Sequence, residues 1–203
     1  KQNKLNSPSE IQGYGSDICY SCNSLSEKSQ ALESNYALQI NYCNFSDTIS
    51  KFKEGSIYIS ILSKETSRSV KINRCLFTVG SLMIHSINPS VLFHVSDCEF
   101  QGESSLFFHG ITGNVENCRF NDIKNIVPIH YECNSDEKTN EEQLFKIEKC
   151  QFYQENEIYS LIFFVPKISS RFAFVDNEIN IPNNKTYVFN CYSDKELEGS
   201  WRF

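Results

Sequence analysis

Val95-Ser96-Asp97-Cys98-Glu99-Phe100 is one copy of a six-residue motif that recurs along this chain. The motif reads apolar-x-x-Cys-x-Phe, and a last, degenerate copy carries Asn in place of Cys. Because chance does not readily produce six copies in one chain, the motif predicts a repeat protein. The copies span residues 40–45, 72–77, 95–100, 115–120, 147–152 and, in degenerate form, 174–179.

The spacing of the copies varies while the motif stays constant. Successive Phe positions are 32, 23, 20 and 32 residues apart, and the degenerate copy follows after another 27. Constant segments joined by loops of free length are typical of a solenoid, in which each coil buries its apolar side against its neighbours. Short apolar runs of strand length also recur between the motifs, without a helical period of comparable length. These runs span residues 56–60, 81–85, 105–109, 126–130 and 160–164.

Two or three strands per coil, with no helix between them, predict a parallel β-helix. The pattern resembles the right-handed parallel β-helix superfamily, the pectate-lyase-like fold. Within it, the pattern resembles the Cys/Asn-rich β-helix repeat surface proteins of some microbial eukaryotes. The resemblance covers the chain from Cys22 or Tyr36 to Ile179 and implies an all-β solenoid of about six to seven coils with a C-terminal cap. It is specific for fold and not for activity, since this superfamily hosts many functions.

Composition limits the protein class. The 203 residues suit one or two domains, and 40% hydrophobic residues are enough for a sizeable core. The mean hydropathy is −0.39, and no apolar stretch is long enough to insert into a membrane. A net charge of −6 argues against nucleic acid as a partner. We expect a loosely ordered segment over 1–16, the β-helix over 17–181 and a cap over 182–203.

The motif predicts two ladders inside the coils. Equivalent positions in stacked coils lie about 4.8 Å apart, and residues two apart on a strand face the same side. The Cys and Phe of each motif are therefore expected inside, as a column of thiols beside a column of rings. Asn177 continues the thiol column and fits a turn position. The predicted Cys ladder is Cys43, Cys75, Cys98, Cys118 and Cys150, and the Phe ladder is Phe45, Phe77, Phe100, Phe120 and Phe152.

Nine cysteines leave other chemistry open. Disulfides between neighbouring coils are an alternative, although in-register strands hold thiols near the limit of acceptable geometry. Cys19-x-x-Cys22 is weak evidence for zinc on its own, and His130-x-x-Cys133 lies several coils away. A disulfide from Cys19 or Cys133 to another loop is favoured over zinc, and no cofactor is expected.

The second set of strands has an unusual outward face. With Leu106 and Phe108 turned inward, alternation turns Phe107 outward. Contiguous outward apolar side chains usually mark an interface, and the alternative is that a loop of the same chain covers them. The predicted outward apolar residues are Tyr58, Met83, Phe107 and Ile162.

Three histidines are expected beside this stripe. His85, His109 and His130 occupy equivalent positions in three successive coils, flanked by Ser60 and Phe164. Such a column is most simply an outward polar ladder, or part of the binding face. It is also a weak candidate for a metal site or a pH-sensitive surface.

An enzyme is the less favoured class. The chain lacks the carboxylate cluster with Arg of calcium-dependent pectate lyases, and His109-Gly110 is only a fragment of the Gly-His-Gly element of polygalacturonases. No pair of outward carboxylates can be placed at a catalytic separation, and acidic residues are common on solvated turns. The carboxylates considered are Asp97, Glu99, Glu116, Asp122 and Glu148.

Two N-glycosylation sequons begin at Asn44 and Asn184, with Asn44 expected to point outward. With the fold and the cysteine content they favour a secreted or cell-surface location. The sequence therefore predicts a non-enzymatic protein that binds a protein or glycan partner through its outward apolar and histidine face. The alternatives are a structural subunit of a filament or larger assembly, and a polysaccharide lyase or hydrolase.

Overall fold

A computed structural model describes residues 18–22, 36–45, 57–61, 69–86, 92–110, 112–124, 126–132, 143–165, 170–183 and 185–192. Within these ranges the protein is all-β and contains no helix, and hence no helix that could cross a membrane. The strands form two sheets, and every strand pairing is parallel. The all-β, parallel-strand part of the prediction is therefore confirmed.

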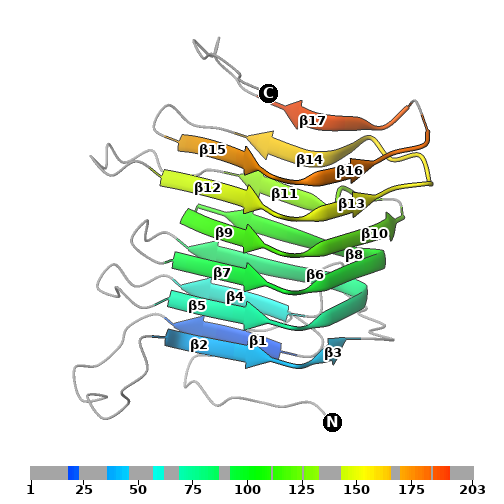
Figure 1. The fold of residues 1–203 in the computed structure, drawn as a ribbon. Coiled ribbons are helices and arrows are strands. Elements are labelled where there is room, and N and C mark those ends of the chain that lie inside the picture. Colours follow the sequence, from blue (N-terminus) through cyan, green and yellow to red (C-terminus); the bar gives the residue numbers. More distant parts are fainter. Residues whose placement is uncertain are drawn as a thin grey trace, which may run out of the picture.

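The smaller sheet has six strands and forms the front of the molecule in Figure 1. In spatial order it consists of β15 (Ser170–Val175), β12 (Gln143–Glu148), β9 (Thr112–Glu116), β7 (Leu92–Ser96), β5 (Ser69–Asn73) and β2 (Tyr36–Asn41).

The larger sheet has eleven strands and curls into a half-barrel (Figure 1). One part of it comprises β3 (Asn44–Phe45), β10 (Arg119–Ile123), β13 (Gln151–Tyr153) and β16 (Glu178–Asn180). The other part comprises β1 (Ile18–Cys22), β4 (Ile57–Ile61), β11 (Ile129–Glu132), β14 (Ser160–Val165) and β17 (Tyr187–Cys191). Two long strands, β6 (Leu76–Ser86) and β8 (Glu99–His109), run through both parts and join them.

The repeated motif spans the bend between the two sheets and is not a single strand. β5 ends at Asn73, Arg74 has a φ of 54°, and β6 begins after Cys75. The residue before the ladder position has a φ of 52–56° in all six copies, a left-handed conformation that bends the chain from one sheet into the other. Backbone bonds join neighbouring copies: the Arg74 amide donates to the Ser96 carbonyl over 3.1 Å. The bend is thus the same in each copy because it is bonded to the next.

The core contains the predicted ring column. Phe45, Phe77, Phe100, Phe120 and Phe152 are all buried, with successive ring centroids 4.8, 4.8, 5.0 and 4.8 Å apart and nearly parallel planes. A second aromatic cluster joins the sheets, since the ring of Phe145 on β12 lies 4.4 Å from Tyr131 on β11. Gly113 faces this cluster, and a Cβ there would lie 3.3 Å from the Phe145 ring. Side chains from both sheets therefore share one core.

The chain ends fall largely outside the described residues. Residues 1–16 lie outside them, and so do Trp201 and Phe203, so the domain boundaries remain predictions. β17 pairs in parallel with β14 and continues the larger sheet by one strand.

Candidate functional site

The outward face formed by β4, β6, β8, β11 and β14 carries an uninterrupted line of large side chains. Register places Tyr58 beside Met83, Met83 beside Phe107, Phe107 beside His130 and His130 beside Phe163. We call these five residues the apolar column. All five are partly exposed, whereas their inward neighbours Ile57, Leu82, Leu106, Ile129 and Ile162 are fully buried.

Two residues that the sequence predicts for this outward face, Ile162 and Phe164, are buried instead. Ile162 was expected outward but is buried in the register of Leu106 and Ile129, and Phe163 takes the outward position. Phe164 was expected beside the histidines but is 5% exposed. The cause lies at the strand start, where Ser160, Leu161 and Ile162 are buried in succession before alternation begins. Counting alternate faces from Ser160 therefore gives the wrong side.

His130 was expected in line with His85 and His109 and lies one column away. β11 begins only at Ile129, which pairs with Leu106, so His130 is the partner of Phe107. Pro128 ends the preceding segment, since it has no amide hydrogen for the ladder, and its carbonyl accepts a hydrogen bond from the Leu106 amide. The 126–130 run is thus not one strand aligned with 105–109.

Rings in the apolar column pack against one another. The His130 ring centroid lies 4.4 Å from that of Phe107 and 4.8 Å from that of Phe163. The planes are tilted by 40° and 53°. Burial lowers the pKa of His130, which favours its neutral form. At neutral pH the column therefore behaves as a continuous apolar strip.

A second column runs parallel to the first, two residues further along each strand. Ser60 pairs with His85, His85 with His109 and His109 with Glu132. The His85 and His109 rings are stacked, with centroids 4.6 Å apart and planes within 15°. Burial, and next the charge of His109, lower the pKa of His85. Stacked imidazoles do not converge on one point, and the described residues contain no group of three metal-binding side chains.

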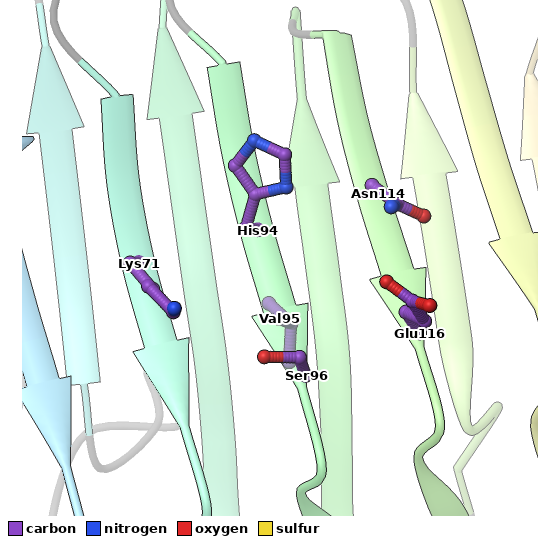
Figure 2. Close-up of a pocket in the computed structure, with 6 residues that line it drawn as sticks. All are labelled: Lys71, His94, Val95, Ser96, Asn114 and Glu116. Atoms are coloured by element: carbon purple, nitrogen blue, oxygen red, sulfur yellow. The ribbon is translucent and has the colours of Figure 1, made fainter.

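The outward face of the smaller sheet is mostly polar, although Leu92, Leu144 and Val175 are exposed on it. A hollow of about 150 Å³ lies across β5, β7 and β9, and Figure 2 shows the side chains that line it. One outward row across the strands consists of Lys71, His94 and Asn114, which carry hydrogen-bond donors. The neighbouring row includes Ser96 and Glu116, which carry a hydroxyl and a carboxylate group. We call this surface the polar face. Its hollow is lined by Lys71, His94, Val95, Ser96, Asn114 and Glu116.

The carboxylates of the polar face are neutralised within the chain. Glu148 lies 2.6 Å from Lys146, and the hydrogen bond from this lysine lowers the pKa of Glu148. Glu116 lies 3.4 Å from Lys149. A glycosidase needs one carboxyl group protonated near neutral pH, and a lysine partner favours the opposite state. The arrangement therefore does not supply an acid and base pair.

The Cys ladder lies inside the bend. Cys75, Cys98, Cys118 and Cys150 are buried free thiols, and Cys43 is a partly buried one. Each buried thiol has two carbonyls within donor distance, one in its own copy and one in the preceding copy, as Cys98 has Ser96 at 3.2 Å and Ile72 at 3.8 Å. At the end of the ladder, Asn177 accepts from the Cys150 amide over 2.8 Å and donates to the Ile147 carbonyl over 3.0 Å. The ladder is therefore a hydrogen-bonded seam, and burial raises the pKa of Cys118 well above its ordinary value.

Several other predicted sites are only partly described. The side chains of Cys19 and Cys22, and all of Cys133, lie outside the described residues, and so does Asn184. Asn44 is exposed on β3.

The chain was compared with known proteins at the level of sequence and of structure. No protein-family model, curated protein or solved structure matches it.

Proposed function

We propose that this protein is a right-handed parallel β-helix of six to seven coils that binds another protein through the apolar column. The observation that carries the proposal is the contrast between its two outward faces. Five neighbouring strands present the unbroken line Tyr58, Met83, Phe107, His130 and Phe163, whereas the smaller sheet presents mostly lysines, amides and carboxylates, with Leu92, Leu144 and Val175 exposed among them. A contiguous apolar strip on one side of such a molecule is what an interaction surface requires.

A protein fits the apolar column better than a glycan does. A sugar stacks on the face of an aromatic ring, whereas the rings of Phe107, His130 and Phe163 turn toward one another along the column. The edges of these three rings and the Met83 side chain are then the groups that a partner can contact. Thioether and aromatic side chains are adaptable protein-contact groups.

The proposal includes a secreted or cell-surface location. Support comes from the sequon at Asn44, whose side chain is exposed. A free thiol ladder suits a reducing compartment as well, so location is to be tested by finding the glycan on Asn44 in protein from the native source.

The test compares charge on the two faces. Phe107→Glu places a carboxylate in the apolar column, and His94→Glu places one at an equivalent outward position of the polar face. We expect wild type and His94→Glu to enhance the fluorescence of Nile red, a neutral dye for apolar surfaces, and Phe107→Glu to lose most of the enhancement. Equal dye binding by both variants, or unfolding of Phe107→Glu alone, would mean that the column is covered by its own chain.

Sedimentation velocity identifies the class of partner. A single species near 23.4 kDa at all concentrations supports binding of a different protein. Larger species that disappear in Phe107→Glu and persist in His94→Glu would make a second copy the partner. They would then favour the structural-subunit alternative.

A further inference from the structure

The histidine pair beside the apolar column cannot take up two protons independently. His85 and His109 stack with ring centroids 4.6 Å apart. Charging one imidazole creates a cation against the face of the other, and two such cations repel at this distance. The protonation of one histidine of the pair therefore opposes the protonation of the other.

The neighbours of the pair decide which histidine is charged first. On β4, the register partner of His85 is Ser60, which carries no charge. On β11, the register partner of His109 is Glu132, whose carboxylate favours a cation beside it. The first proton is therefore expected on His109, and His85 is held neutral to a lower pH.

The third histidine lies within the apolar column itself. His130 contacts Phe107 on β8 and Phe163 on β14, neither of which titrates. The charged groups that act on it are Glu132, two residues along its own strand, and His109. A proton on His130 would place a cation in the middle of a strip whose other ring neighbours are apolar. All three imidazoles thus lie where a charge changes the same surface.

We propose that the apolar column is an acid-released contact, which accepts an apolar protein surface when His85, His109 and His130 are neutral and expels it when they are charged at acidic pH. The release of a protein partner at acidic pH rests on the proposed function of the apolar column. The coupled titration of His85 and His109 does not depend on that function. An interface that buries an unpaired charge is strongly destabilised, so protonation of His130, which lies between the rings of Phe107 and Phe163, opposes binding.

Ring NMR signals of the full chain between pH 8 and pH 5 test the titration. His94, on the polar face, is an internal reference because it belongs to neither column. In His109→Gln, we expect the midpoint of His85 to rise, since its cationic neighbour is gone, and the midpoint of His94 to stay unchanged. A His85 midpoint that does not move would overturn the coupling and, with it, the proposed device.

Nile red binding at pH 7.4 and pH 5.5 tests the release. We expect wild type to lose most of its dye enhancement at pH 5.5, and the triple variant His85→Gln/His109→Gln/His130→Gln to keep it. If this variant does not fold, His130→Gln alone is expected to reduce the loss. Equal wild-type binding at both pH values overturns release and leaves the proposed function intact. No wild-type binding at pH 7.4 overturns both.

Discussion

Removing one ring from the Phe ladder should cost more in the middle than at its end. Phe100 is fully buried, and its ring lies 4.8 Å from Phe77 and 5.0 Å from Phe120. Phe→Ala in a core costs about 3–5 kcal/mol, and each stacked ring pair is worth about 0.5–1.5 kcal/mol beyond the buried area. Phe100→Ala loses two pairs, so we expect a loss near the upper end, about 5 kcal/mol.

The matched control is Phe45→Ala. Phe45 is also buried, at 6% exposure, and among the described residues Phe77 is its ring partner at 4.8 Å. It should therefore lose about 1 kcal/mol less free energy of unfolding than Phe100→Ala. Urea unfolding followed by far-ultraviolet circular dichroism measures both. An equal or larger loss in Phe45→Ala would refute the idea that ring stacking stabilises the column.

Other predictions concern the thiol seam and the histidines. Under iodoacetamide, folded protein should be alkylated at exposed Cys191 and protected at Cys118, and peptide mass spectrometry of a labelled Cys118 would disprove its burial. Asn177→Ala should reduce the free energy of unfolding by about 1–3 kcal/mol, because it leaves the Cys150 amide unbonded; an unchanged urea midpoint would contradict this. Burial lowers the pKa values of His85 and His130 below the ordinary 6.5. Their contribution to stability should therefore be complete above pH 6.5 and decline as pH falls through the folded-state values, and thermal melts showing no such decline would contradict the burial of these rings.

The sequence predicts the strands and the inward ladders because these depend on period-two alternation within one short motif. Cys98 and Phe100 occupy fixed positions after the bend, so their buried side follows from the motif alone. The left-handed bend was not predicted. Asp97, Asn117 and Asp176 carry the usual signal for this conformation, but Tyr42, Arg74 and Lys149 at the equivalent positions do not, so the six copies share no common turn residue.

Register errors account for the mistakes at the candidate site. Three consecutive residues are buried at Ser104–Leu106 in β8 and again at Ser160–Ile162 in β14, so Ser160 corresponds to Ser104 and not to Ser105. A shift of one residue exchanges the two faces, which moved Ile162 and Phe163 to the wrong sides. Gly102 marks the bend before this segment, with a φ of 64°. The alternation of buried and exposed residues identifies the outward face only if the residue at which the alternation begins is known.

Oxidation of Met83 most directly tests the claim that the apolar column is available to a partner. Met83 is the single methionine of the chain and lies between Tyr58 and Phe107 in the column. In folded monomer treated with dilute hydrogen peroxide, we expect sulfoxide to form at a rate close to that of a free methionine peptide. Protection until urea unfolds the protein would show that the chain covers its own face, and would contradict the account.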